Sequence, residues 1–349
     1  MARQSKRPRG SAPVTLKDVA REAGVSYQTV SRAVNGFPEV SPKTSARIRK
    51  IAAQLGYHPN RVAGGLRTSR SKVIGLVLSD VENSFFAQVA SAVEAEAASR
   101  GYSVILANSG ESIEREKIAV ISLIERRVDG LIVAPAEGSH AYLKDLLSAR
   151  LPVVAVNRSM ADFACSAVLT ENNEGGRLAA DYLIKRGHTR IGVVVGSFGL
   201  ITSRERLAGF SAALRDAGIP VRHSWIGAGG LFPDGARGAA TRILSQADRP
   251  TALFASSNRI SEGVLLALAE LGLKRGRDLD VIGFDKTPWI RLVEPPLPVV
   301  AQQTDLLGVE SVKLLLAIMN NEVSSPRTIR VPVQLIADPI VDLGFLGSL

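Results

Sequence analysis

The chain has 349 residues, 46% of them hydrophobic, and carries a net charge of +10 at pH 7. That length and composition fit two or three folded domains rather than a disordered chain. No apolar run reaches the ~18 residues of a membrane-spanning helix, and no apolar segment follows the basic N-terminus as in a secretory signal. Cys165 is the only cysteine, which excludes an internal disulfide and fits a cytoplasmic protein.

The positive charge is concentrated near the N-terminus. Residues 1–72 hold 15 Lys and Arg against three acidic residues, whereas residues 73–349 hold 28 basic and 30 acidic residues. A basic segment on a near-neutral body is typical of a nucleic-acid-binding module. Residues 1–14 are interpreted as a basic disordered tail, which could contact DNA or could simply be a soluble end.

A helix-turn-helix is predicted directly after this tail. Thr15 can cap a helix over residues 16–23, and Gly24 suits the left-handed conformation that ends it. Ser26 can cap a second helix over residues 27–35. The very short connection between the two helices is typical of this DNA-binding motif.

A third helix completes the predicted DNA-binding domain, residues 15–58. Ser41 and Pro42 are a cap and a first-turn proline, and the helix is expected to run to about Leu55. Each of the three helices has one apolar stripe, so together they can form a small core.

The second helix is the expected DNA-reading element, because in this motif its N-terminal residues meet base edges in the major groove. Gln28 suits adenine, and Arg32 suits guanine through two hydrogen bonds. Hydroxyl and amide side chains nearby are of the type that binds phosphates. The candidate DNA-binding residues of the domain are Thr15, Ser26, Tyr27, Gln28, Thr29, Ser31, Arg32 and Asn35.

Two motifs in this region resemble the lac repressor family (LacI/GalR). VTLKDVAREAGVSYQTVSRAVN, residues 14–35, resembles the family's DNA-binding headpiece, and YHPNRVAGGL, residues 57–66, is similar to its hinge. The resemblance implies that the hinge, residues 59–71, forms a short helix on DNA and pushes a leucine into the minor groove. The matching hinge residues are Asn60, Arg61, Ala63 and Leu66, although Leu66 could instead be a linker residue that packs on the body.

Apolar strands and amphipathic helices alternate from residue 73 to residue 284. The expected strands are 73–78, 102–107, 130–134, 153–156, 190–195, 251–255 and 281–284. The expected helices are 84–100, 112–127, 174–186, 203–217, 233–246 and 260–271. Such alternation predicts parallel sheets covered on both faces, and the run is too long for one sheet. We therefore expect an α/β body of two doubly wound lobes.

The body also resembles the lac repressor family, whose core has the type I periplasmic-binding-protein fold. The motifs that carry this resemblance include GLIVAP, VVAVNR, ENNEGGRLAADYLIKRGHTRIGVV, SRERLAGF, VIGFD and EPPLPVV. The resemblance implies an effector-binding and dimerisation core over residues 72–349. Its first lobe would comprise about 72–170 and 299–330, and its second about 171–298 and 331–349. The chain would then cross between lobes near residues 170, 298 and 331.

The resemblance places a small-molecule effector in the cleft between the lobes, at strand ends. The candidate effector-binding residues are Ser79, Phe86 and Asn157 of the first lobe, and Arg206, Phe232, Asn258 and Asp285 of the second. Arg206 offers a forked donor, and Asp285 can accept from paired hydroxyls. Phe86 and Phe232 could sandwich a ring. A phenylalanine is also often a core residue, and Asp285 could be a helix cap.

Three departures from the family pattern each remove a negative charge from the expected cleft or its rim. Asn157 stands where the family often has Asp, Asn258 where it usually has Asp, and Lys286 where an acid is frequent. Together with Arg158 and Arg206, these changes predict tolerance of an anion. They favour a sugar acid or another carboxylated or phosphorylated metabolite over a neutral sugar.

Other functions have little support in the sequence. The four histidines show no metal-ligand spacing, and no nucleotide-binding or nucleophile motif is found. We therefore expect no enzyme activity, metal or cofactor. The expected protein is a transcription regulator, a repressor by resemblance, that binds double-stranded operator DNA as a homodimer. The C-terminal VDLGFLGSL is too short and glycine-broken for a tetramer-forming coiled coil. A transport-receptor-like binding protein is the alternative.

Overall fold

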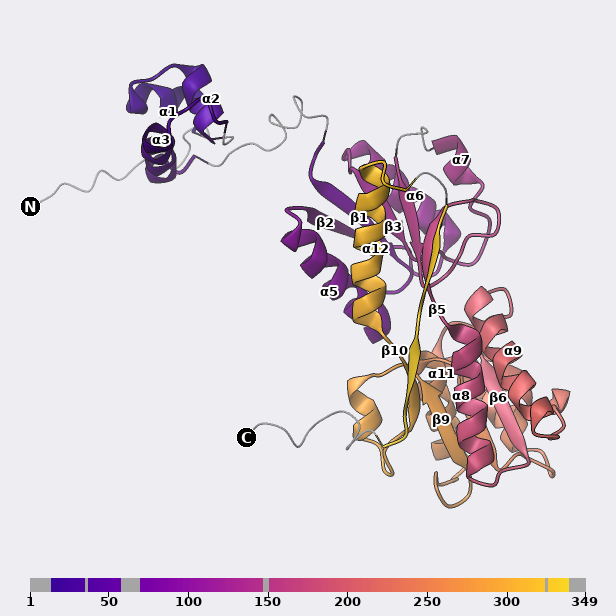
Figure 1. Cartoon of the computed structure of the whole chain (residues 1–349). Helices are drawn as coiled ribbons and strands as arrows, with labels where there is room; N and C mark the ends of the chain where they lie inside the picture. The colour runs from indigo at the N-terminus through magenta and orange to yellow at the C-terminus, as the bar shows by residue number, and fades with distance from the viewer. Residues whose placement is uncertain (1–13, 35–36, 58–69, 147–150, 324–325, 339–349) are drawn as a thin grey trace, which may run out of the picture. The chain divides into compact units, whose positions relative to one another are not determined.

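The computed structural model describes residues 14–34, 37–57, 70–146, 151–323 and 326–338 (Figure 1). The chain divides into two compact units, residues 1–71 and 72–349. Among the described residues, no helix is long and apolar enough to cross a membrane.

The first unit contains three helices, α1 (Leu16–Ala23), α2 (Tyr27–Val34) and α3 (Pro42–Leu55). Their apolar stripes meet in one small core, whose buried members are Val19, Ala20, Ala23, Val30, Ala33, Ile48 and Ala52. The helix ends form where the sequence predicts them. Thr15 and Asp18 make a reciprocal capping box at the start of α1, and Gly24 ends it with φ of 60°. Gly24 is suited to this left-handed position because it has no Cβ.

The second unit has two α/β lobes. The first contains a six-stranded parallel sheet of order β11-β5-β4-β3-β1-β2. Its strands are β1 (Val73–Leu78), β2 (Ser103–Asn108), β3 (Gly130–Val133), β4 (Val153–Val156), β5 (Ser166–Thr170) and β11 (Thr328–Val331). Its helices are α5 (Ser84–Ser99), α6 (Ile113–Glu125), α7 (Tyr142–Leu146) and α12 (Thr304–Met319). Helices α5 and α12 cover one face of the sheet and share its core, whereas α6 and α7 contribute to the core on the other face.

The second lobe repeats this design with the order β12-β10-β9-β8-β6-β7. Its strands are β6 (Ile191–Val195), β7 (Ile226–Ala228), β8 (Ala252–Ala255), β9 (Asp280–Phe284), β10 (Val299–Gln302) and β12 (Val333–Ile336). Its helices are α8 (Asn172–Lys185), α9 (Ile201–Asp216), α10 (Pro233–Leu244) and α11 (Asn258–Glu270), with short 3-10 helices η1 (His223–Trp225) and η2 (Pro288–Arg291). Only β12, which pairs with β10, is antiparallel within this sheet.

The chain passes between the lobes after β5, after β10 and between β11 and β12 (Figure 1). We expected the second passage near residue 298, and that boundary is wrong. Residues 299–302 form β10, which pairs with β9 and β12 of the second lobe. The chain therefore returns to the first lobe only after Gln302, at the start of α12.

Candidate functional site

The helix-turn-helix presents its second helix to solvent. Ser26 accepts a hydrogen bond from the backbone N–H of Thr29 at 3.1 Å, which caps the start of α2. Tyr27, Gln28 and Arg32 are exposed on this helix, whereas Val30 and Ala33 face the core. Exposed donors and acceptors at the start of a helix are what base reading in the major groove requires.

The remaining predicted DNA-binding residues divide into two sets. Thr15 and Ser26 are exposed and Thr29 and Ser31 are half-buried, all on the surface of the first unit. Asn35 and the hinge residues Asn60, Arg61, Ala63 and Leu66 lie outside the described residues, as does the predicted hinge helix. The contacts of both sets with DNA remain predictions.

A nearly closed cleft lies between the two lobes of the second unit. Its volume is about 70 Å³, far below the ~300–1,000 Å³ typical of ligand pockets. Five of the seven expected effector-binding residues line it: Phe86, Asn157, Arg206, Asn258 and Asp285. The small volume indicates that the lobes are closed on one another, with room for a few water molecules.

Arg206, on α9, is the anchoring cation of the second lobe. Its Nε donates to Oδ1 of Asn172 at 2.9 Å, and its Nη1 donates to the carbonyl oxygen of Ser256 at 2.6 Å. Its guanidinium carbon lies 3.7 Å from the centre of the Phe284 ring. Burial lowers the pKa of Arg206 to about 10, and the Asp285 carboxylate opposes that shift. The guanidinium is therefore charged at neutral pH and fixed in place.

Two glycines allow the helix that carries Arg206 to lie this close to its neighbour. A Cβ on Gly176 of α8 would lie 2.0 Å from the carbonyl oxygen of Arg206. A Cβ on Gly209 of α9 would lie 1.8 Å from the carbonyl oxygen of Asn173. Because both contacts are with backbone, any larger residue would push the two helices apart and displace the arginine.

Asp285 sits at the carboxyl end of β9 and is held by two neighbours. Its Oδ2 accepts from the backbone N–H of Asn258 at 3.0 Å, and its Oδ1 accepts from Nε2 of Gln302 at 2.6 Å. Gln302 in turn accepts from the hydroxyl of Thr170. Thr170 and Gln302 end β5 and β10, so this chain of hydrogen bonds joins the cleft to the strands where the chain changes lobes.

The first lobe contributes a second buried arginine that the candidate list omitted. Arg158 binds Glu111 through two hydrogen bonds of 2.6 and 2.8 Å, and its Nη1 also donates to the carbonyl oxygen of Pro135 at 2.9 Å. Its guanidinium carbon lies 5.8 Å from the Phe86 ring centre. Ser79 does not line the cleft but lies behind it, where it donates to the carbonyl oxygen of Ala134. Ser79 therefore supports the wall and does not face the cavity.

Asn157 and Asp285 occupy equivalent places in the two lobes. Asn157 follows β4 with φ of 66°, and Asp285 follows β9 with φ of 73°. Asn and Asp tolerate this left-handed conformation better than other side chains. The side-chain oxygen Oδ1 of Asn157 is buried and has no hydrogen-bond partner among the described residues. A buried acceptor of this kind suits a ligand hydroxyl.

Polar contacts between the lobes close the rim of the cleft. Nδ2 of Asn258 donates to Oδ1 of Asn83 at 2.7 Å. Arg259 forms an ion pair of 3.1 Å with Asp80. Asn258 and Arg259 come from α11, whereas Asn83 and Asp80 precede α5 in the other lobe. The closed arrangement is therefore held by side chains as well as by the shape of the lobes.

The prediction that Phe232 lines the cleft is wrong. Phe232 is 55% exposed and precedes α10, and Leu231 lines the cleft in its place. Pro233 starts α10 directly after Phe232, so the extended backbone before it points neighbouring side chains to opposite sides. The expected sandwich of two aromatic rings is therefore absent from the described cleft.

Several residues that the candidate list omitted face the same cleft. They share polar side chains, and they come from loops after strands, from the first turns of α9 and α11 and from the end of β10: Asp80, Glu111, Arg158, Ser203, Arg259 and Gln302. Arg158 appears in the VVAVNR motif, but nothing local in the sequence indicates that Glu111 is its partner. No group of His, Cys, Asp or Glu that could hold a metal is found in the described part of the chain.

Comparison with known proteins covers both units. The family described as "Bacterial regulatory proteins, lacI family" matches residues 15–60. The family described as "Periplasmic binding proteins and sugar binding domain of LacI family" matches residues 71–338. The HTH-type transcriptional repressor PurR of Yersinia pestis (strain Pestoides F) is 37% identical over 325 residues, covering 92% of this chain and 95% of that protein.

Two solved structures are similar in fold. A putative ribose operon repressor from Burkholderia thailandensis is 50% identical, with a TM-score of 0.73, and covers 77% of this chain and 100% of its own. The lac repressor dimer bound to operator and the anti-inducer ONPF is 30% identical, with a TM-score of 0.83, and covers 93% of this chain and 98% of its own.

Proposed function

The chain belongs to the LacI family of DNA-binding transcriptional repressors, and from this premise we propose that it binds a palindromic operator as a homodimer and responds to a monosaccharide. Like its relatives, it is a transcriptional regulator and not an enzyme. The transport-receptor alternative is set aside, because the chain carries the family's DNA-binding segment. We further propose that it acts in the cytoplasm.

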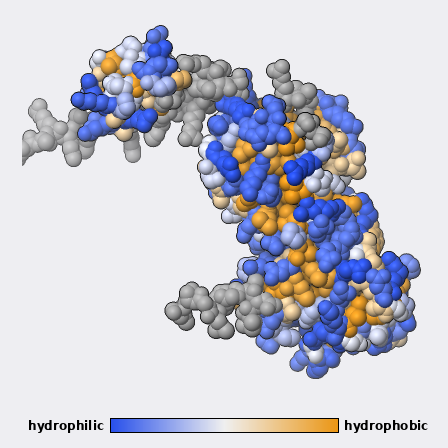
Figure 2. Space-filling model, in the orientation of Figure 1, coloured by the Kyte–Doolittle hydropathy of each residue, from blue (hydrophilic) through white to orange (hydrophobic). Residues whose placement is uncertain are grey.

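The homodimer follows from the way the first unit reads DNA. One helix-turn-helix covers one half-site, so a palindromic operator requires two copies related by two-fold symmetry. The second unit exposes some hydrophobic side chains that a partner copy could cover, and Figure 2 shows hydrophobic side chains among hydrophilic ones on one face. Leu266 and Leu292 of the second lobe are 47% and 83% exposed. Sedimentation should show a dimer at micromolar concentration, and a stable tetramer would contradict the proposal.

The charge pairing in the cleft supports a neutral sugar over the anion that the sequence favoured. The prediction of an anionic effector was based on the arginines alone, without the carboxylates that pair with them. Arg158 is neutralised by Glu111 and Arg259 by Asp80, and Arg206 faces the field of Asp285. A balanced set of donors and acceptors suits the hydroxyls of a sugar.

The cleft must open to admit any sugar. Its closed volume of about 70 Å³ has room for only a few water molecules, so a small effector such as a monosaccharide requires the least separation of the lobes. The relative that is 50% identical is named for a ribose operon, so D-ribose is the first effector to test. The observation that carries this proposal is the convergence of Arg206, Asp285 and Asn258 on one enclosed cleft.

The proposal can be tested with the full chain. An operator is first selected from random DNA, and its binding is measured by fluorescence anisotropy with and without D-ribose. Binding to one palindromic sequence that D-ribose strengthens or weakens would support the proposal. A protein that selects no sequence, or whose operator affinity no monosaccharide changes, would contradict it.

A further inference from the structure

A ring of hydrogen bonds connects the two proposed effector anchors, Arg206 and Asp285, through the three crossings where the chain passes between the lobes. One half of the ring runs from Asp285 to Gln302, at the end of β10, and from there to Thr170, at the end of β5. Thr170 precedes the first crossing and Gln302 precedes the second. This half of the ring therefore ties one anchor to two crossings.

The other half of the ring starts at Arg206 and runs through Asn172 to Glu205. Asn172 is the first residue of α8, just after the first crossing, and is only 1% exposed. Its Oδ1 accepts from Nε of Arg206 and its Nδ2 donates to Oε2 of Glu205, both at 2.9 Å. Burial lowers the pKa of Arg206, and the Glu205 carboxylate is one of the charges that oppose this shift. Glu205 therefore influences both the direction and the charge of the anchor.

Arg330 closes the ring across the two lobes. Its Nη2 donates to Oε1 of Glu205 at 2.9 Å, and its Nη1 donates to the carbonyl oxygen of Thr170 at 3.3 Å. The hydrogen bond with Glu205 raises the pKa of Arg330, which keeps its guanidinium charged. Arg330 lies in β11 of the first lobe, one residue before that strand ends at the third crossing, whereas Glu205 lies on α9 of the second lobe. The ion pair therefore spans the lobes.

The ring lies where a rotation of the lobes has to be taken up. In two-lobed proteins a few residues between the rigid parts absorb the change of backbone angle on closure. The ring has a member beside each of the three crossings: Thr170, Gln302 and Arg330. A change of lobe angle therefore alters the distance between Arg330 and Glu205.

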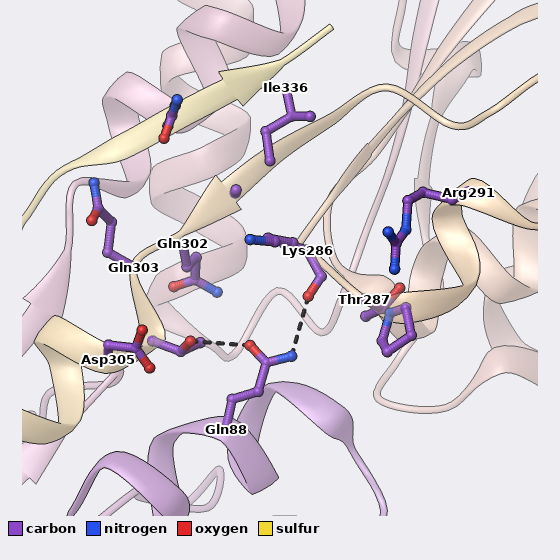
Figure 3. A pocket seen from close by; sticks show the side chains of 12 residues that line it. Gln88, Lys286, Thr287, Arg291, Gln302, Gln303, Asp305 and Ile336 are labelled. Carbon is purple, nitrogen blue, oxygen red and sulfur yellow. Dashed lines mark hydrogen bonds between the residues drawn. The ribbon is translucent and has the colours of Figure 1, made fainter. Parts of the chain in front are cut away.

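The second crossing is also held from the first lobe by Gln88 of α5. Figure 3 looks into the cavity beside this crossing and shows the two hydrogen bonds of Gln88. Its Nε2 donates to the carbonyl oxygen of Lys286 at 3.2 Å, and its Oε1 accepts from the hydroxyl of Thr304 at 3.0 Å. Lys286 directly follows Asp285. The position of Asp285, like that of Arg206, therefore depends on contacts with the first lobe.

We propose that Glu205 and Arg330 are positioning residues that couple the angle between the lobes to the effector anchors. The inference rests on the proposed response to an effector. Neither residue is among those that line the described cleft, so the pair acts through Asn172 and Thr170. With the pair intact, the closed lobe angle and the bound direction of Arg206 favour one another, and effector binding is linked to closure.

Hydrogen exchange on the full chain without any ligand tests the ring directly. Arg330→Gln should raise exchange of the backbone amides of β5 and β11, with which Arg330 is in contact, and also of β10, which it does not contact. Because the side chains of Arg330 and Glu205 are 35% and 14% exposed, the expected rise in β10 is about two- to fivefold. Glu205→Gln should give the same rise. Arg330→Lys retains a charge that can pair with Glu205 and should exchange like the wild type.

Operator binding tests the link to the effector. In Arg330→Gln, the factor by which D-ribose changes operator affinity should fall by about two- to fivefold. Arg330→Lys should retain most of the wild-type factor. Both affinities are measured by fluorescence anisotropy with labelled operator DNA.

Arg177→Gln is the matched control. It breaks an ion pair of 3.0 Å between Arg177 of α8 and Asp216 of α9, inside the second lobe, and it should leave exchange in β10 unchanged. Unchanged exchange of β10 in Arg330→Gln would overturn the inference, and so would an equal rise in Arg177→Gln. If D-ribose does not alter operator affinity in the wild type, the proposed effector is wrong, whereas the exchange result still decides whether the pair acts on the crossings.

Discussion

Replacing Arg206 with methionine should separate effector binding from operator binding. Nε of this side chain donates to Asn172 and Nη1 donates to Ser256. Nη2 therefore remains available to a ligand in the cleft. A hydrogen bond from a charged donor contributes about 1.5–3 kcal/mol. Its loss should therefore raise the dissociation constant for the effector by about 10- to 150-fold.

The same substitution should have a smaller effect on folding than the lost contacts suggest. Arg206→Met leaves two buried acceptors without partners, at about 1–3 kcal/mol each. It also removes a buried charge whose pKa burial lowers to about 10, a change that favours the variant by roughly 3 kcal/mol. The variant should therefore fold, with a modestly lower melting temperature.

The assay pairs two measurements on one sample. Titration calorimetry with D-ribose reports effector affinity, and fluorescence anisotropy of labelled operator DNA reports operator affinity. Arg215→Met is the matched control, because Arg215 is exposed on the last turn of the same helix. The reasoning is refuted if Arg206→Met binds D-ribose as tightly as the wild type does. It is also refuted if Arg215→Met shows the same loss.

Three further outcomes are expected. Asp80→Asn and Arg259→Gln should each weaken effector binding by about two- to fivefold. The double variant should bind the effector no more weakly than either single variant, because the pair acts as one contact between the lobes. Additive losses of affinity would argue against that contact. Leu231→Ala should weaken effector binding measured by calorimetry, whereas Phe232→Ala should not, and the reverse result would restore the original assignment. Arg32→Ala should cost about 1–3 kcal/mol on the operator and flatten discrimination at one base pair; anisotropy on a set of single-substitution operators checks this, and an unchanged base preference would count against it.

The elements of the first unit could be predicted because their signals are local. Thr15 and Gly24 mark the ends of α1 through contacts made within the helix itself. Strands β1, β2, β3, β4, β6, β8 and β9 were predicted for a similar reason, since each is a short apolar run, whereas β5 and β7 were missed. Such signals need no knowledge of the distant parts of the chain.

The strands near the lobe crossings depend on distant pairing and were missed or misassigned. Residues 299–302 were assigned to the segment that returns to the first lobe. They form β10, which belongs to the second lobe because β9 and β12 pair with it. The Arg158–Glu111 pair joins residues 47 positions apart, so no local sequence pattern indicates this contact. Phe232 and Leu231 are adjacent in an extended segment, so their side chains point in opposite directions. Resemblance alone could not settle so small a shift.

The threading of the chain through both lobes has a consequence for synthesis on the ribosome. The sheet of the first lobe has β5 as an open edge until β11, Thr328–Val331, is available. Its core also lacks Leu307, Val312 and Leu315 of α12 until the second lobe has been made. The helices of the first unit, in contrast, are complete once Leu55 has emerged. A message truncated near its end would therefore yield a folded DNA-reading head on a body with an exposed strand edge, a feature that favours aggregation.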